Sequence, residues 1–177
     1  GQTCIAPDYA LVHENVRDAF VAEFHAQVKS LLGENPKESE YYVRMVRDAA
    51  FERVSSYVVE NVGMDASERY IEPSVVLDPA PDSPVMTTEI FGPVLPVISV
   101  KSVDEALDFI LEREKPLALY YFGNKADGMD VMRRTSSGGA CINDTIMHIV
   151  NDSVPFGGVG NSGMGSYHGK RSFDAFT

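Results

Sequence analysis

The sequence predicts an α/β fold with an open, mostly parallel sheet and helices on both of its faces. Two observations lead to this prediction. Short, almost continuously apolar runs alternate with segments whose apolar residues recur at helical spacing. The chain has 177 residues, of which 44% are hydrophobic, so it can bury a sizeable core. We place no domain boundary inside it and expect residues 1–177 to form one domain.

In the first half of the chain, helical spacing is clearest over residues 15–32. Gly33 and Pro36 then end the pattern, as a glycine followed by proline does at a helix C-terminus. A second helix is predicted over residues 42–62, ahead of a further glycine. The short apolar run at residues 9–12 is assigned to no element.

In the second half, strands and helices alternate regularly. The β-branched run at 94–100 predicts a buried strand. Ser102 is followed three residues later by Glu105, a capping box that predicts a helix running through Arg113. The other predicted elements are strands at 74–77, 117–122 and 139–143 and a helix at 125–135.

Charge and composition exclude several classes of function. The chain has 15 basic and 26 acidic residues, a net charge of −11, which repels nucleic acid and anionic membranes. No apolar run approaches the ~20 residues that cross a bilayer. The two cysteines, Cys4 and Cys141, lack disulfide-framework or zinc-ligand spacing, and the four histidines are scattered. We therefore expect a soluble protein in a reducing compartment, the cytoplasm, with no metal site.

The glycine-rich stretch at residues 155–165 contains a GxGxxG string from Gly158 to Gly163. A dinucleotide site built on that string needs a strand before it, a helix after it and an acid about 20 residues further on. Here Pro155 and Phe156 precede the string, and the chain ends fourteen residues after it. We interpret the glycines as a tight crossing of backbone segments.

Taken singly, the reactive residues leave more than one interpretation open. Cys4 is either a nucleophile or a small buried hydrophobe, and Cys141, inside a predicted strand, is most simply a core residue. Glu89 and Phe91 lie in the loop before the strand at 94–100, where open α/β sheets place ligand-binding groups. A solvated acid and a core aromatic are the alternatives for those two positions.

Five strings considered together resemble the aldehyde dehydrogenase superfamily: GQTCIAPDY, TEIFGPVLP, KPLALYYFGN, SSGGACIND and PFGGVGNSGMGSYHGK. The last looks most like class 3, the fatty and aromatic aldehyde branch. The resemblance implies a catalytic-domain fragment, with the nucleotide-binding domain, a side-chain oxyanion donor and the general-base glutamate upstream of Gly1. It also implies that a C-terminal oligomerisation strand lies beyond Thr177, and that the GxGxxG string is structural.

Carried over position by position, the resemblance assigns roles to five residues. Cys4 falls on the catalytic thiol, Glu89 on the acid that holds the nicotinamide ribose, and Phe91 on the aromatic beside the nicotinamide ring. Phe156 falls near the aldehyde pocket and His148 near its entrance. No metal ligand is implied.

The implied function is the catalytic half of an NAD(P)-dependent aldehyde dehydrogenase. It oxidises a small-molecule aldehyde to a carboxylic acid through a cysteine thiohemiacetal and a thioester. The cofactor is NAD or NADP, and the parent protein is expected to be a homodimer. Two alternatives stay open for this chain: a non-catalytic folding or interaction domain, and a thiol esterase that needs no dinucleotide. The aldehyde that is oxidised is left open.

Overall fold

Parallel strand pairing dominates the structure, a computed structural model that describes residues 1–177. The α/β class and the mostly parallel pairing predicted from the sequence are confirmed; the one antiparallel pair joins β2 (Met64–Asp65) to β3 (Tyr70–Ile71). Packing divides the chain into two units, Gly1–Lys101 and Ser102–Thr177. A single domain over residues 1–177 stays a prediction.

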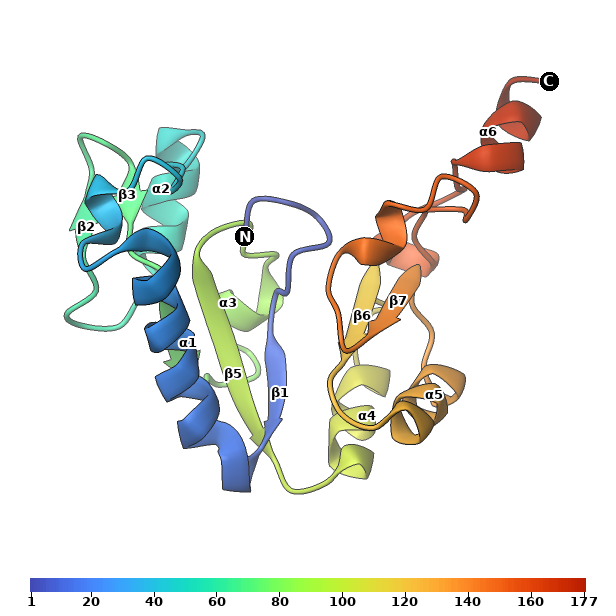
Figure 1. Ribbon diagram of the computed structural model, residues 1–177, viewed down its shortest axis with the longest axis horizontal. Helices are drawn as coiled ribbons and strands as arrows, with labels where there is room; N and C mark the ends of the chain where they lie inside the picture. The colour runs from blue at the N-terminus through green and yellow to red at the C-terminus, as the bar shows by residue number, and fades with distance from the viewer. The chain divides into compact units, whose positions relative to one another are not determined.

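The first unit is built on a three-stranded sheet in the order β1-β5-β4. Figure 1 shows β1 and β5 side by side. β5 (Val94–Val100) lies between β1 (Ala10–His13) and β4 (Ser74–Leu77), and it is parallel to both. Its central position explains its continuous apolar sequence, since both edges are paired and Val97 is completely buried. The strands predicted at 74–77 and 94–100 are confirmed, whereas β1 was not predicted.

The helices of this unit differ from prediction in one place. A 3-10 turn at Glu14–Val16 leads into α1 (Arg17–Leu32), which ends at Gly33 with φ of 88°, as predicted. The helix predicted over 42–62 is wrong, because only α2 (Asp48–Ser55) is helical. Residues 42–47 are a loop that carries Met45 into the core, where its N–H donates to the Arg69 carbonyl at 3.0 Å. A short turn at Pro36–Glu38 and α3 (Pro84–Thr87) complete the unit.

The core of the first unit joins α2 to the loop that precedes β5. Its buried members come from five separate stretches of chain: Met45, Val54, Ile71, Val85, Ile90 and Val94. Ile90 belongs to the TEIFGPVLP string, so the loop that carries Glu89 and Phe91 is anchored in this core rather than free in solvent.

The second unit has a parallel pair, β6 (Ala118–Tyr121) and β7 (Gly139–Ile142), with two helices beside it (Figure 1). In α4 (Val103–Leu111), the predicted N-cap is present, since the Glu105 N–H donates to Ser102 Oγ at 3.1 Å. α5 (Lys125–Arg134) agrees with the predicted helix. The remaining elements are the 3-10 turns Met147–Ile149 and Gly160–Ser162 and the helix α6 (Gly169–Phe176). No helix of the chain combines the length and apolar character needed to span a membrane.

Candidate active site

Cys4 lies in a tight turn with its side chain exposed. The Ala6 N–H donates to the Thr3 carbonyl at 3.1 Å, which closes the turn around Cys4 and Ile5. Ile5 is only 5% exposed, so it anchors the turn while its neighbour remains accessible. The backbone N–H of Cys4 makes no hydrogen bond within the chain. The thiol is therefore presented to solvent on a fixed backbone with a free donor beside it.

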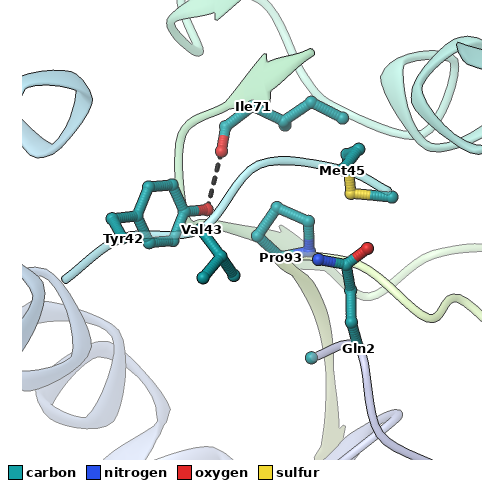
Figure 2. A pocket seen from close by; sticks show the side chains of 7 residues that line it. Gln2, Tyr42, Val43, Met45, Ile71 and Pro93 are labelled. Carbon is teal, nitrogen blue, oxygen red and sulfur yellow. Dashed lines mark hydrogen bonds between the residues drawn. The ribbon is translucent and has the colours of Figure 1, made fainter. Parts of the chain in front are cut away.

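Gln2 ties this segment to the loop before α2. Its amide nitrogen donates to the Arg44 carbonyl at 3.0 Å, and its amide oxygen accepts from the Val46 N–H at 3.2 Å. Figure 2 shows Gln2 at the edge of a small cavity of about 50 Å³, across from Tyr42, whose hydroxyl donates to the Ile71 carbonyl at 2.7 Å. Cys4 does not line this cavity, so the cavity lies apart from the thiol.

The segment that carries Cys4 contacts the loop at 89–92 at both of its ends. At one end, a Cβ added to Gly1 would lie 1.9 Å from the Gly92 carbonyl oxygen, so only glycine allows this approach. At the other end, the Ile90 N–H donates to an Asp8 carboxylate oxygen at 3.0 Å. Burial raises the pKa of Asp8, while the Ile90 N–H and the charge of Arg53 act in the opposite direction.

Within that loop, the side chains of Glu89 and Phe91 are exposed, whereas Ile90 between them is buried. The Glu89 carboxylate is exposed and makes no hydrogen bond or ion pair with the rest of the chain. Phe91 is 38% exposed, and its backbone has φ of 49°, the left-handed region that residues with a Cβ rarely adopt. The structure thus brings the Cys4 segment, Glu89 and Phe91 together in the first unit.

The two pocket residues predicted from the resemblance lie in the second unit and contact each other. The rings of His148 and Phe156 are stacked, with centroids 5.9 Å apart. His148 Nδ1 lies 3.6 Å from Cys141 Sγ, and its Nε2 is buried without a hydrogen-bond partner. Burial lowers the pKa of His148, so the neutral ring is favoured. Cys141 is half-buried.

The glycine-rich stretch is packed against its own backbone, as predicted. A Cβ on Gly158 would lie 2.3 Å from the Ser162 carbonyl, and one on Gly157 would lie 2.3 Å from the Gly165 oxygen. The predicted tight crossing is therefore confirmed. The only regular structure within the GxGxxG string is the 3-10 turn at Gly160–Ser162.

Three residues that organise the site were not singled out from the sequence: Gln2, Asp8 and Arg53. Gln2 and Asp8 belong to the GQTCIAPDY string, and a polar side chain in such a string is the signal that could have drawn attention to them. Arg53 has no comparable signal, because a helical arginine is usually a solvated surface residue.

The Aldehyde dehydrogenase family matches the chain over residues 1–177. The rat protein named "Aldehyde dehydrogenase, dimeric NADP-preferring" is 48% identical, covering 100% of this chain and 40% of its own length. The 4,4'-diaponeurosporen-aldehyde dehydrogenase of Staphylococcus aureus is 45% identical, again over 100% of the chain and 40% of the relative. The solved substrate-bound state of Staphylococcus aureus AldH superposes with a TM-score of 0.94 at 44% identity, covering 99% of this chain and 40% of that one. The chain thus spans about two-fifths of the length of these relatives, and it belongs to the aldehyde dehydrogenase family.

Proposed function

We propose that this chain is the thiol-bearing catalytic part of an NAD(P)-dependent aldehyde dehydrogenase, with Cys4 as the nucleophile. The observation that carries the proposal is the exposed Cys4 thiol on an anchored turn, in a segment that contacts the loop bearing Glu89 and Phe91. Membership of the family supports it, as do the names of the relatives. We further propose that residues 1–177, all of which the family model covers, belong to one catalytic domain, and the rat relative's name supports a dimeric parent protein.

The first step forms a bond between Cys4 and the substrate. The Cys4 thiolate adds to the aldehyde carbonyl carbon, and the carbonyl oxygen becomes the oxyanion of a thiohemiacetal. Because the Cys4 backbone N–H has no partner in the chain, it is free to donate to that oxyanion. The Gln2 anchor and the Ala6–Thr3 hydrogen bond that closes the turn hold this donor and the sulfur in one fixed arrangement.

The second step oxidises the bound carbon. When bound, NAD(P)⁺ accepts the hydride that leaves this carbon. The exposed, unpartnered carboxylate of Glu89 suits the vicinal hydroxyls of a ribose, and the exposed face of Phe91 suits a planar ring. Loss of the hydride leaves a Cys4 thioester, and addition of water to it releases a carboxylic acid and restores the thiol.

Phe156 and His148 are proposed to line the aldehyde pocket. Their stacked rings form one half-buried aromatic surface, which suits the apolar body of a fatty or aromatic aldehyde. The name of the rat relative favours NADP, and NAD stays the alternative cofactor.

The proposal is tested in the intact protein that contains this chain. We expect it to reduce NAD(P)⁺ with aliphatic or aromatic aldehydes, and Cys4→Ser to lower the rate by about 10³-fold or more. Cys141→Ser, at the other cysteine of the chain, is the matched control and should lower the rate far less than Cys4→Ser. Wild-type protein that reduces neither cofactor with any such aldehyde would contradict the proposal. If it still hydrolyses a nitrophenyl ester through Cys4, the thiol esterase alternative is supported instead.

A further inference from the structure

Arg53 donates hydrogen bonds to the backbone of the loop at 89–92 from both terminal nitrogens of its guanidinium. From α2, its Nη1 donates to the Glu89 carbonyl at 3.1 Å and its Nη2 donates to the Ile90 carbonyl at 2.8 Å. The guanidinium also lies over the Tyr57 ring, 5.7 Å from its centroid. A planar fork on two consecutive carbonyls fixes the orientation of the backbone between them, which a single donor would not do.

Asp8 binds the same stretch of backbone through the N–H group of Ile90. Its carboxylate accepts from the Ile90 N–H at 3.0 Å, across a separation of 82 residues. Both backbone polar groups of Ile90 are therefore bonded to side chains from other parts of the chain. Ile90 itself is only 1% exposed, so water has little access to compete for these bonds.

The residue that follows Ile90 needs this support. Phe91 has a positive φ of 49°, and such backbone strain persists where the surrounding structure enforces it. On its other side, Gly92 packs so closely on Val54 that a Cβ would lie 2.9 Å from one of the valine methyl groups. The bonds at Ile90 and the packing at Gly92 thus hold the backbone on both sides of Phe91. They thereby set the directions of the Glu89 and Phe91 side chains.

We propose that Asp8 and Arg53 form a clamp that fixes residues 89–92 relative to Cys4, and that both are positioning residues for the cofactor-dependent step. The inference rests on the proposed function. Asp8 is four residues from Cys4 in the same anchored segment, so the clamp links the position of the thiol to that of the loop. Neither side chain needs to contact the reacting atoms.

The test compares Arg53→Met and Asp8→Ala in the intact protein. Each should raise the KM for NAD(P)⁺ by about 10- to 100-fold, the scale of a small misplacement of binding groups. Alkylation of Cys4 by iodoacetamide without cofactor should change by less than about twofold, since the turn at Cys4 keeps its own hydrogen bond. Asp8→Asn keeps an acceptor for the Ile90 N–H and should restore most of the wild-type KM.

The negative charge of Asp8 distinguishes a positioning role for this residue from direct contact with the dinucleotide. The dinucleotide is anionic, so removing the Asp8 carboxylate would by charge alone favour its binding. A higher KM in Asp8→Ala therefore reports displacement of the loop. Arg113→Met is the matched control, since Arg113 also donates to a carbonyl, that of Phe109 at 2.9 Å, and lies over the Phe109 ring, but in the second unit. It should leave the KM unchanged.

Amide hydrogen exchange tests the clamp without any activity. The Ile90 amide should exchange about tenfold faster or more in Asp8→Ala and at the wild-type rate in Asp8→Asn. Unchanged exchange in Asp8→Ala would overturn the clamp, and so would an unchanged KM in both Asp8→Ala and Arg53→Met. Wild-type protein that reduces no NAD(P)⁺ would refute the proposed function, while the Ile90 exchange would still decide whether the clamp exists.

Discussion

Replacing Gly92 with alanine should destabilise the protein and disturb the proposed cofactor loop. The added Cβ would lie 2.9 Å and 3.0 Å from the two methyl carbons of Val54 and 3.5 Å from Met45 Cε. Carbon atoms in van der Waals contact prefer about 3.5–4.0 Å, so the valine or the loop must move by about 0.5–1 Å. Val54 is 0% exposed and is β-branched in a helix, so its side chain cannot rotate away freely.

Overpacking of this kind costs about 1–3 kcal/mol of unfolding free energy. We expect Gly92→Ala to lose that amount in urea unfolding of the intact protein, with an unchanged denaturant slope. Gly63→Ala is the control, because its Cβ would meet the Glu72 carboxylate at 2.8 Å, the end of a flexible side chain that can move. Gly63→Ala should therefore lose less unfolding free energy than Gly92→Ala.

The double variant Gly92→Ala/Val54→Ala identifies the cause. Val54→Ala alone opens a cavity, which the new methyl group at position 92 partly fills. The double variant should therefore be more stable than the sum of the single effects by about 1 kcal/mol. Additive effects, or a Gly92→Ala protein within about 0.5 kcal/mol of wild type, would refute the reasoning that this contact requires glycine.

Three further predictions concern the cofactor, the thiols and pH. This chain alone should bind no NAD⁺ or NADP⁺ in titration calorimetry, since a ribose and a ring contact supply a few kcal/mol against an association cost of about 4–15 kcal/mol; micromolar binding abolished by Gly160→Val would contradict this. Iodoacetamide should alkylate exposed Cys4 faster than half-buried Cys141, and equal rates would argue against an accessible nucleophile. Burial lowers the pKa of His148, so the folded protein binds fewer protons there than the unfolded chain. Stability should fall as pH drops below the ordinary histidine pKa of about 6.5 and on through the lowered one. An NMR titration that finds His148 at or above the ordinary value would contradict the assignment.

Local patterns predicted most of the elements because those elements depend on nearby residues. The run at 94–100 is apolar throughout since β5 is paired on both edges, and Ser102 caps α4 through a residue three positions away. The helix predicted at 42–62 was wrong because Met45 is buried by a loop that bonds to Arg69, and its apolar spacing imitates a helix. β1 was missed because its four residues lead directly towards the helical pattern with no breaker after them, whereas prolines bound the equally short β4 on both sides.

For the candidate site, the sequence predicted candidate residues but not the contacts that join their segments. Motif strings singled out Cys4, Glu89 and Phe91 as candidates, and the structure adds how the segments that carry them are joined. The contacts that join them span long stretches of sequence, 82 residues for Asp8 to Ile90 and 37 for Arg53 to Ile90. No spacing rule predicts such pairs, since they exist only once α2 and the loop before β5 share one core.

The central claim is that Cys4 forms a covalent bond with the aldehyde, and the most direct measurement is to trap that bond. The intact protein, while turning over an aldehyde with NAD(P)⁺, would be quenched in acid, digested and mapped by mass spectrometry. We expect an acyl group as a thioester on the peptide that contains Cys4, absent from a reaction without cofactor and from Cys4→Ser. An acyl group on Cys141 instead, or oxidation of the aldehyde with no acyl group on Cys4, would contradict the account.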